Sequence, residues 1–335
     1  MKKLFFGILA MAAMAACATE DTIEAPQGDA IEFGNPFVDN SVRATEAEDP
    51  SYTSTSLQAF KVYGAVNGQN IFAGAQVTGT VGSNSAWTLA AGTPAQYWIA
   101  GASYTFDAVV DATDVETDAA GLPVYLEYTA DGKTDMLHNR QTTVGKPTTN
   151  GGMVAFTFTH LLSKVKFTVE NTTAADADNY QYIVKNIKIT NAYASGKYAV
   201  VDQKDGETVT AAANTWFDCV PAGTDDTVHV VENLTVASAS TQVCAQELLL
   251  IPGASVGVSF EVEIQMNNGT AENPNWVTIP MDATVYNKNY PVVATLEANK
   301  AYNFKVVVGL GDQIQFTATK MNGWDTTPGT TELED

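Results

Sequence analysis

Short segments in which apolar and polar residues alternate recur along most of the chain. Successive side chains of a β-strand point to opposite faces, so this period of two is typical of strands with one buried face. β-Branched and aromatic residues dominate the segments, and turn-forming residues separate them. The segments are residues 30–33, 57–63, 98–100, 104–110, 124–128, 153–160, 165–169, 183–189, 228–231, 248–251, 256–264, 302–308 and 314–318. We therefore predict an all-β fold of antiparallel sandwiches.

The first residues resemble the signal of a bacterial lipoprotein. Lys2 and Lys3 precede an uncharged, apolar stretch at residues 4–16, which is shorter than a membrane-spanning helix requires. Small residues end this stretch and Cys17 follows directly, as in the lipobox, whose cysteine is acylated before cleavage. We predict a signal peptide at residues 1–16, lipid on Cys17 and delivery to the outer membrane. Ordinary signal cleavage with an incidental cysteine is the alternative.

The length and the charge of the chain limit its organisation and its partners. Its 335 residues exceed one ordinary sandwich, and a fresh set of alternating segments begins near residues 160–170. We predict a tether with one strand at 17–43, an N-terminal domain at 44–165 and a C-terminal domain at 166–335; no repeat of fixed period is evident. The formal net charge of −21 argues against binding nucleic acid or anionic lipid headgroups.

Residues that could carry out catalysis are few. Histidine occurs only at His138, His160 and His229, and no spacing in the sequence matches a metal-binding motif or a nucleophilic triad. We predict no enzyme activity, no cofactor and no metal site. Once the first cysteine is lipidated, Cys219 and Cys244 remain in a compartment where disulfides persist. They form either a disulfide or two buried thiols.

Three stretches of the chain resemble the fimbrillins, which are the subunits of type V pili. They are FTFTHLLSKVKFTV at residues 156–169, LLLIP at residues 248–252 before a long alternating strand, and the final strands up to Trp324. The leader and the stretch around residues 31–44 extend the resemblance over the whole chain. The resemblance implies two transthyretin-like antiparallel β-sandwich domains in tandem.

The resemblance also implies that an arginine-specific protease processes the precursor after its transport to the outer membrane. Arginine occurs only at Arg43 and Arg140, and Arg43 precedes a small residue, Ala44. Cleavage after Arg43 would release residues 17–43 and, with them, a strand of the first domain. Arg43 as an ordinary residue of a solvated tether is the alternative. Arg140 is also predicted to lie in a loop, where cleavage would be feasible.

A sandwich that loses an edge strand can accept a strand from another subunit. In fimbrillins the donor comes from the C-terminal region, and here Ile314, Phe316 and Ala318 alternate with polar residues. An ordinary last strand of the second domain would show the same pattern. The predicted partners are other pilin subunits, the membrane through the lipid, and a host or bacterial surface ligand. The alternative function is a monomeric surface lipoprotein that binds a glycan or a host protein.

Overall fold

The computed structural model describes residues 28–38, 56–80, 87–172, 180–223, 228–237, 240–280, 287–309 and 314–321. These ranges contain strands β1 to β23 and a single short helical turn, η1 (Asn150–Gly152). The predicted all-β fold is confirmed. Within the described ranges, no helix is long and apolar enough to cross a membrane. The predicted lipidation and cleavage positions, Cys17, Arg43 and Ala44, lie outside the described residues.

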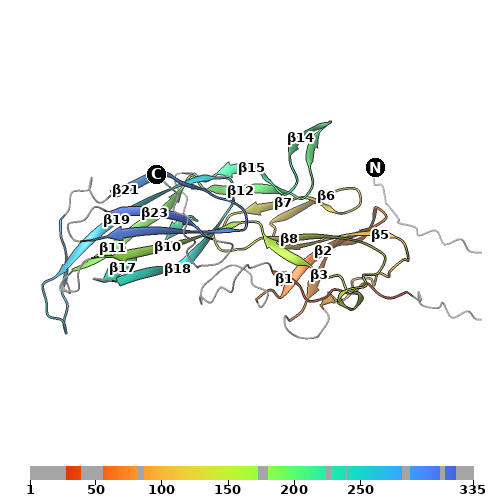
Figure 1. Cartoon of the computed structure of the whole chain (residues 1–335), viewed down its shortest axis with the longest axis horizontal. Helices are drawn as coiled ribbons and strands as arrows, with labels where there is room; N and C mark the ends of the chain where they lie inside the picture. Colours follow the sequence, from red (N-terminus) through yellow and green to blue (C-terminus); the bar gives the residue numbers. More distant parts are fainter. Residues whose placement is uncertain are drawn as a thin grey trace, which may run out of the picture.

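The N-terminal half of the molecule contains two sheets and a projecting hairpin (Figure 1). The larger sheet has the order β1-β9-β8-β5-β2-β3-β4, with bounds Phe37–Val38, Thr157–His160, Leu137–Val144, Ser103–Val110, Ala59–Val66, Gln69–Thr78 and Thr88–Leu89. The smaller sheet has the order β15-β12-β7-β6, with bounds Trp216–Pro221, Tyr193–Ala199, Pro123–Thr129 and Asp114–Thr117. The hairpin consists of β13 (Gln203–Asp205) and β14 (Thr208–Ala211).

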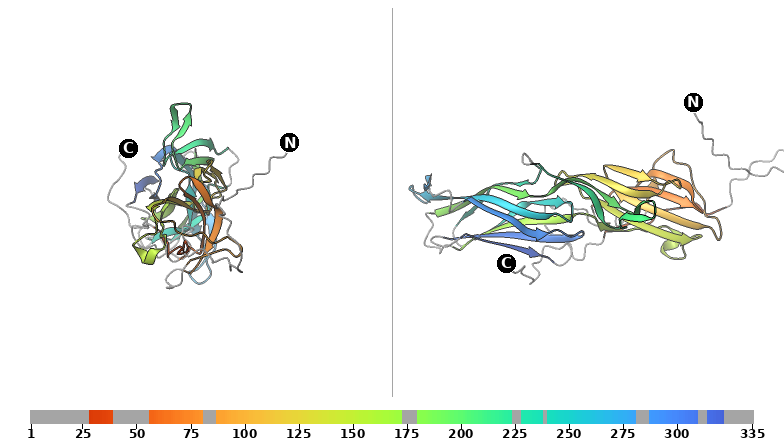
Figure 2. Two further views of the ribbon diagram at one scale, coloured as in Figure 1. Left: turned by 90° about the vertical axis from the view of Figure 1, so that its right-hand side faces the viewer. Right: turned by 90° about the horizontal axis from the view of Figure 1, so that it is seen from above.

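The C-terminal half contains two further sheets. One has the order β18-β10-β22-β23, with bounds Ser240–Leu250, Ser163–Asn171, Lys300–Val308 and Gln315–Lys320. The other has the order β16-β11-β19-β20, with bounds Val230–Val231, Tyr180–Thr190, Ser255–Asn267 and Trp276–Thr278. β17 (Leu234–Ala237) pairs with β11, and β21 (Asn287–Thr295) pairs with β19. Figure 2 shows these sheets at one end of an elongated molecule and the larger N-terminal sheet at the other.

Local sequence explains why these strands form and where they turn. β19 buries alternate residues between 256 and 264, whereas Glu261 and Glu263 lie on its opposite face; this is the period-two pattern of a half-buried strand. β2 and β3 are joined by Asn67 and Gly68, whose φ angles are 48° and 77°. Two positive φ angles in a two-residue loop are characteristic of the type I′ turn, which matches the twist of the flanking strands.

Buried apolar side chains form three clusters along the molecule. One fills the N-terminal half behind the larger sheet, and another lies between the two C-terminal sheets. The third lies between them and combines Tyr128 of β7 and Tyr198 of β12 with Leu249 of β18 and Ile251. Because this cluster draws on both halves of the sequence, it packs the two halves of the molecule against each other where they meet.

The path of the chain crosses the predicted domain boundary at residue 165. β12 and β15 follow that boundary in sequence, yet β12 pairs along β7 of the N-terminal half from Ser195–Thr129 to Ala199–Tyr125. The chain therefore returns to complete a sheet of the first half before it forms β16 to β23. The division of the chain into two tandem domains remains a prediction.

Glu263 on β19 gives a prediction about stability and pH. Its carboxylate accepts hydrogen bonds from Lys185 Nζ (2.7 Å) and Thr278 Oγ1 (2.6 Å), which lower the pKa of Glu263 from its ordinary 4.5 to about 2. A carboxylate whose pKa is lower in the folded than in the unfolded protein stabilises the fold at pH values above its unfolded pKa. This contribution is lost as the pH falls toward its folded pKa. We expect Glu263→Gln to lower the free energy of unfolding at pH 7 by about 1 kcal/mol.

The difference between Glu263→Gln and wild type should shrink as pH falls from 4.5 to about 2, measured by denaturant titration. Glu207→Gln in the exposed β13–β14 turn is the matched control and should change stability little at either pH. A Glu263→Gln difference that stays constant with pH would contradict the assigned interaction.

Candidate functional site

A short N-terminal segment, residues 30–38, runs between two edges of the N-terminal half. Along one edge it is antiparallel, where Phe33 pairs with Trp87. Along the other edge it is parallel, where Phe33 also pairs with Val154 and β1 pairs with β9. The segment therefore occupies a slot that has strand-like backbone on both sides. Without it, both edges would present unpaired backbone groups.

Main-chain hydrogen bonds hold the N-terminal segment on both sides of the slot. Two of them lie on the antiparallel side and three on the parallel side. They are Ile31 N–H to the Gln96 carbonyl (2.8 Å), Trp87 N–H to the Phe33 carbonyl (3.1 Å), Gly34 N–H to the Val154 carbonyl (2.9 Å), Val154 N–H to the Glu32 carbonyl (2.9 Å) and Phe37 N–H to the Phe156 carbonyl (2.9 Å). These bonds join main-chain atoms only, so they do not depend on the identity of the side chains.

Side chains of the N-terminal segment complete the core of this half. Ile31, Phe33 and Val38 are 4%, 1% and 0% exposed, so the segment contributes three fully buried apolar groups. The Phe33 ring lies among four other phenylalanines, with centroid distances of 6.3 Å to Phe60, 5.8 Å to Phe72, 6.3 Å to Phe106 and 6.1 Å to Phe156. These are distances at which aromatic pairs attract each other.

Two polar contacts fix the position of the N-terminal segment along its slot. Trp87 Nε1 donates a hydrogen bond to Asn35 Oδ1 at 2.9 Å. This bond gives the N–H group of the buried indole an acceptor. Just before the segment, Lys146 Nζ lies 2.8 Å from Asp29 Oδ2, and both side chains are solvent-exposed. Neither contact was predicted from the sequence, because nothing local relates these residues.

Asp107, on β5, is the centre of a group of buried and half-buried polar side chains. Its Oδ1 lies 2.8 Å from His138 Nε2 and 2.9 Å from Arg140 Nε, and Arg140 also donates to the Pro123 carbonyl at 2.9 Å. The group thereby connects the larger sheet to β7 of the smaller one. The predicted loop at Arg140 is wrong, since Arg140 lies on β8, as does His138.

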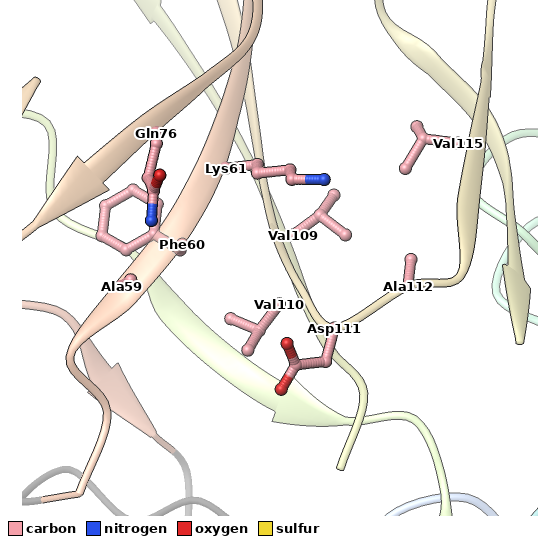
Figure 3. A pocket seen from close by; sticks show the side chains of 9 residues that line it. All are labelled: Ala59, Phe60, Lys61, Gln76, Val109, Val110, Asp111, Ala112 and Val115. Carbon is pink, nitrogen blue, oxygen red and sulfur yellow. The ribbon is translucent and has the colours of Figure 1, made fainter. Parts of the chain in front are cut away.

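A hollow of about 190 Å³ lies where the larger sheet meets the link from β5 to β6. Figure 3 shows Lys61 extending into it, with Asp111 at the end of β5 and apolar Val109, Val110 and Val115 around them. The lining offers one cation, one carboxylate, the side-chain amide of Gln76 and hydrocarbon. In the described part of the chain, no group of three or more His, Cys, Asp or Glu residues is placed to hold a metal ion.

The predicted C-terminal strand lies at the edge of its sheet as β23, paired with β22 from Gln315–Val307 to Lys320–Tyr302. Ile314, Phe316 and Ala318 are partly buried against the C-terminal core. The Phe316 ring stacks on Tyr290 at 4.8 Å. The apolar face predicted from the alternation is therefore the face that packs inward in this structure.

The pairing of Cys219 with Cys244 remains a prediction, because the side chain of Cys244 lies outside the described part of the structure. Cys219 lies half-buried on β15, and burial raises the pKa of its thiol. Cys244 lies on β18, which pairs with β10 in a different sheet. The alternation of apolar and polar residues predicted a strand at each cysteine, but it did not indicate which sheet each strand joins.

Comparison with known proteins identifies relatives of this fold. A family model described as fimbrillin-like matches residues 43–324. A fimbrial protein from Bacteroides vulgatus has a similar structure, with a TM-score of 0.54 and 14% identity over 88% of this chain and 99% of that chain. A candidate cell adhesion protein from Bacteroides ovatus gives a TM-score of 0.48 and 14% identity over 90% of this chain and 99% of that chain. The search of curated proteins found no match.

The burial of Phe33 gives a prediction for the unprocessed protein. We expect Phe33→Ala to lower the free energy of unfolding by about 3–5 kcal/mol, because it removes a ring from a packed aromatic cluster and leaves a cavity. Phe37→Ala is the matched control, since Phe37 is 52% exposed and its replacement should change stability by less than about 0.5 kcal/mol. Equal effects in denaturant unfolding would show that the slot does not depend on Phe33.

Proposed function

Because this chain belongs to the fimbrillin-like family, we propose that it is a structural subunit of a cell-surface fimbria that polymerises by exchanging strands between copies. The observation that carries the proposal is the N-terminal segment, which is bound in its slot as a separable strand. It lies just before Arg43 in the sequence, so a single cleavage would detach it from the rest of the chain. The role is mechanical and requires no catalytic group.

The proposed maturation has two steps. The precursor is first lipidated on Cys17 and held at the outer membrane, where acyl chains anchor it durably. An arginine-specific protease then cuts after Arg43, which separates residues 17–43 and their lipid from the remaining chain. Cleavage after Arg140 is unfavourable, since Arg140 lies within β8 and its side chain is hydrogen-bonded to Asp107 and to the Pro123 carbonyl.

Cleavage would favour association of the mature subunit with another subunit. Loss of the N-terminal segment removes the buried side chains of Ile31, Phe33 and Val38 and leaves hydrogen-bonding groups of Trp87 and Val154 without their partners. Exposed apolar side chains and an open strand edge are both unfavourable in water. A strand from another subunit corrects both defects, and because donor and acceptor lie at different places on each subunit, repeated addition gives a filament.

Proteolysis at Arg43 provides the test. We expect purified precursor treated with an arginine-specific protease to yield a chain that begins at Ala44 by mass and to form ladders of oligomers on electrophoresis. Arg43→Ala should abolish both products because it removes the cleavage site. Fibres from Arg43→Ala protein as abundant as those from wild type would refute processing at this residue.

Arg43→Lys is the matched control for that experiment. It keeps the positive charge of the tether but resists an arginine-specific enzyme, so it should remain monomeric with that enzyme. A protease that accepts lysine should restore cleavage after residue 43 and assembly. If Arg43→Lys assembles without any cleavage, charge rather than processing controls polymerisation.

A further inference from the structure

The tryptophan of β20, Trp276, differs from the other tryptophans that the structure describes. Trp87 and Trp216 donate indole hydrogen bonds within the protein, and the Trp98 ring packs against Tyr104 at 4.7 Å. Trp276 is partly exposed. Within the described ranges its ring joins none of the three apolar clusters and contacts no other aromatic ring, and its indole N–H has no acceptor. Aromatic side chains dominate the energetics of cores and interfaces, so a tryptophan outside the core is a candidate for contact with a ligand.

Strand pairing places neutral polar side chains on the same face of the sheet as Trp276. Asn267 lies directly opposite Trp276, and Gln265 lies opposite Thr278. On its other side, Gln265 lies opposite Gln181 of β11. Directly opposed residues share a face of the sheet, as do residues two apart on one strand. These five residues therefore form one surface, the Trp276 face, and the core residues of β19 lie on the opposite face.

Hydrogen bonds hold the polar side chains of the Trp276 face in place. Gln181 Nε2 donates to Gln265 Oε1 at 2.5 Å. Glu263 Oε1, next to them, accepts from Gln265 Nε2 at 2.9 Å and from Thr278 Oγ1 at 2.6 Å. Asn267 Oδ1 accepts two main-chain N–H groups of the turn that follows it, each at 2.9 Å. Because these side chains are already ordered, binding a ligand would cost them little conformational entropy.

The hydrogen-bonding groups that remain on the Trp276 face are neutral. A side-chain amide carries one carbonyl and two N–H donors, so Gln181 keeps its carbonyl acceptor and Asn267 keeps its Nδ2 donors, beside the indole N–H of Trp276. The carboxylate of Glu263 is paired with Lys185 at 2.7 Å. Since the chain carries a net charge of −21, it repels anions but not neutral ligands. A flat aromatic ring beside neutral donors and acceptors fits a sugar, which has C–H groups on one face and hydroxyls around its edge.

We propose that the Trp276 face binds a neutral carbohydrate chain, with one sugar ring stacked on Trp276 and hydroxyl groups hydrogen-bonded to Asn267 and Gln181. Trp276 and Gln181 are two strands apart, which is about 10 Å, so the ligand is a chain of sugars rather than a single one. In a fibre the site would recur on every subunit, and many weak contacts would act together on a carbohydrate-coated surface.

The position of the Trp276 face keeps it apart from the slot. The sheet that contains β11 and β19 lies at the end of the molecule away from β1 (Figure 1). A bound carbohydrate would therefore not compete with a strand in the slot. The inference goes beyond the proposed assembly and does not depend on it, because a single subunit carries the whole site.

Binding of oligosaccharides to the full chain tests the proposal. The probes are maltohexaose, cellohexaose and a neutral chain of N-acetyllactosamine units, with a heparin hexasaccharide as the anionic comparison. In isothermal titration calorimetry we expect at least one neutral probe to bind and heparin not to bind. Trp276→Ala should weaken binding at least tenfold, because it removes the stacking surface. Trp276→Phe keeps a ring but loses the N–H donor, so it should weaken binding less.

Val277→Ala is the matched control. Val277 is the next residue on β20, is 43% exposed and points to the opposite face, where it pairs with Met266. Its replacement should leave the Kd unchanged. Gln181→Ala should weaken binding several-fold, since it removes one hydrogen-bonding group. Denaturant unfolding of each variant shows whether the fold is intact, so that a lost site is distinguished from an unfolded protein.

The outcomes separate this site from the proposed function. Unprocessed Arg43→Ala protein should bind the same probe as wild type with equal affinity, and processed Trp276→Ala protein should still polymerise. If Trp276→Ala abolishes polymerisation, the Trp276 face is a contact between subunits and the proposal is wrong. It is also wrong if no neutral probe binds, if heparin binds more tightly than they do, or if folded Trp276→Ala binds as wild type does. Binding by a wild-type protein that never polymerises would refute the proposed function alone.

Discussion

The N-terminal half depends on one constraint, which is that both edges beside the slot must be paired. Trp87 and Val154 belong to segments far apart in the sequence, and the same residue, Phe33, bridges both. Unpaired backbone groups next to a buried core are costly, so these edges hold a strand or the core beneath them is exposed. The phenylalanine cluster, the polar contacts at Asn35 and Asp29, and the proposed control of assembly all follow from filling that gap.

Buried polar contacts add directional constraints, between neighbouring strands and between sheets, to the non-directional packing of apolar side chains. Asp107 joins β5 and β8 to the start of β7 through Arg140. In the C-terminal half, Lys164 Nζ on β10 lies 3.3 Å from Glu247 Oε2 on β18, the adjacent strand of the same sheet, with both side chains almost fully buried. Removing charges from water carries a large desolvation penalty, so such pairs add little net stability. Their directional contacts favour one arrangement of the strands that carry them over others.

Sequence patterns were sufficient to predict strands in which apolar residues alternate with polar ones, such as β5, β10 and β19. They failed for β8, because its inward positions hold His138 and Arg140, whose burial depends on Asp107 of a neighbouring strand. They also could not show that β12 returns to β7 or that Cys219 lies in a different sheet from β18.

The direction of the strands has a mechanical consequence. Figure 1 shows the main strands of both halves running roughly along the long axis of the molecule. Hydrogen bonds between antiparallel strands lie perpendicular to the strands. Tension along that axis therefore loads the bonds along the slot in shear, so that they resist together. A force applied across the axis would break these bonds one after another. A filament of such subunits should therefore withstand a larger force along its long axis than across it.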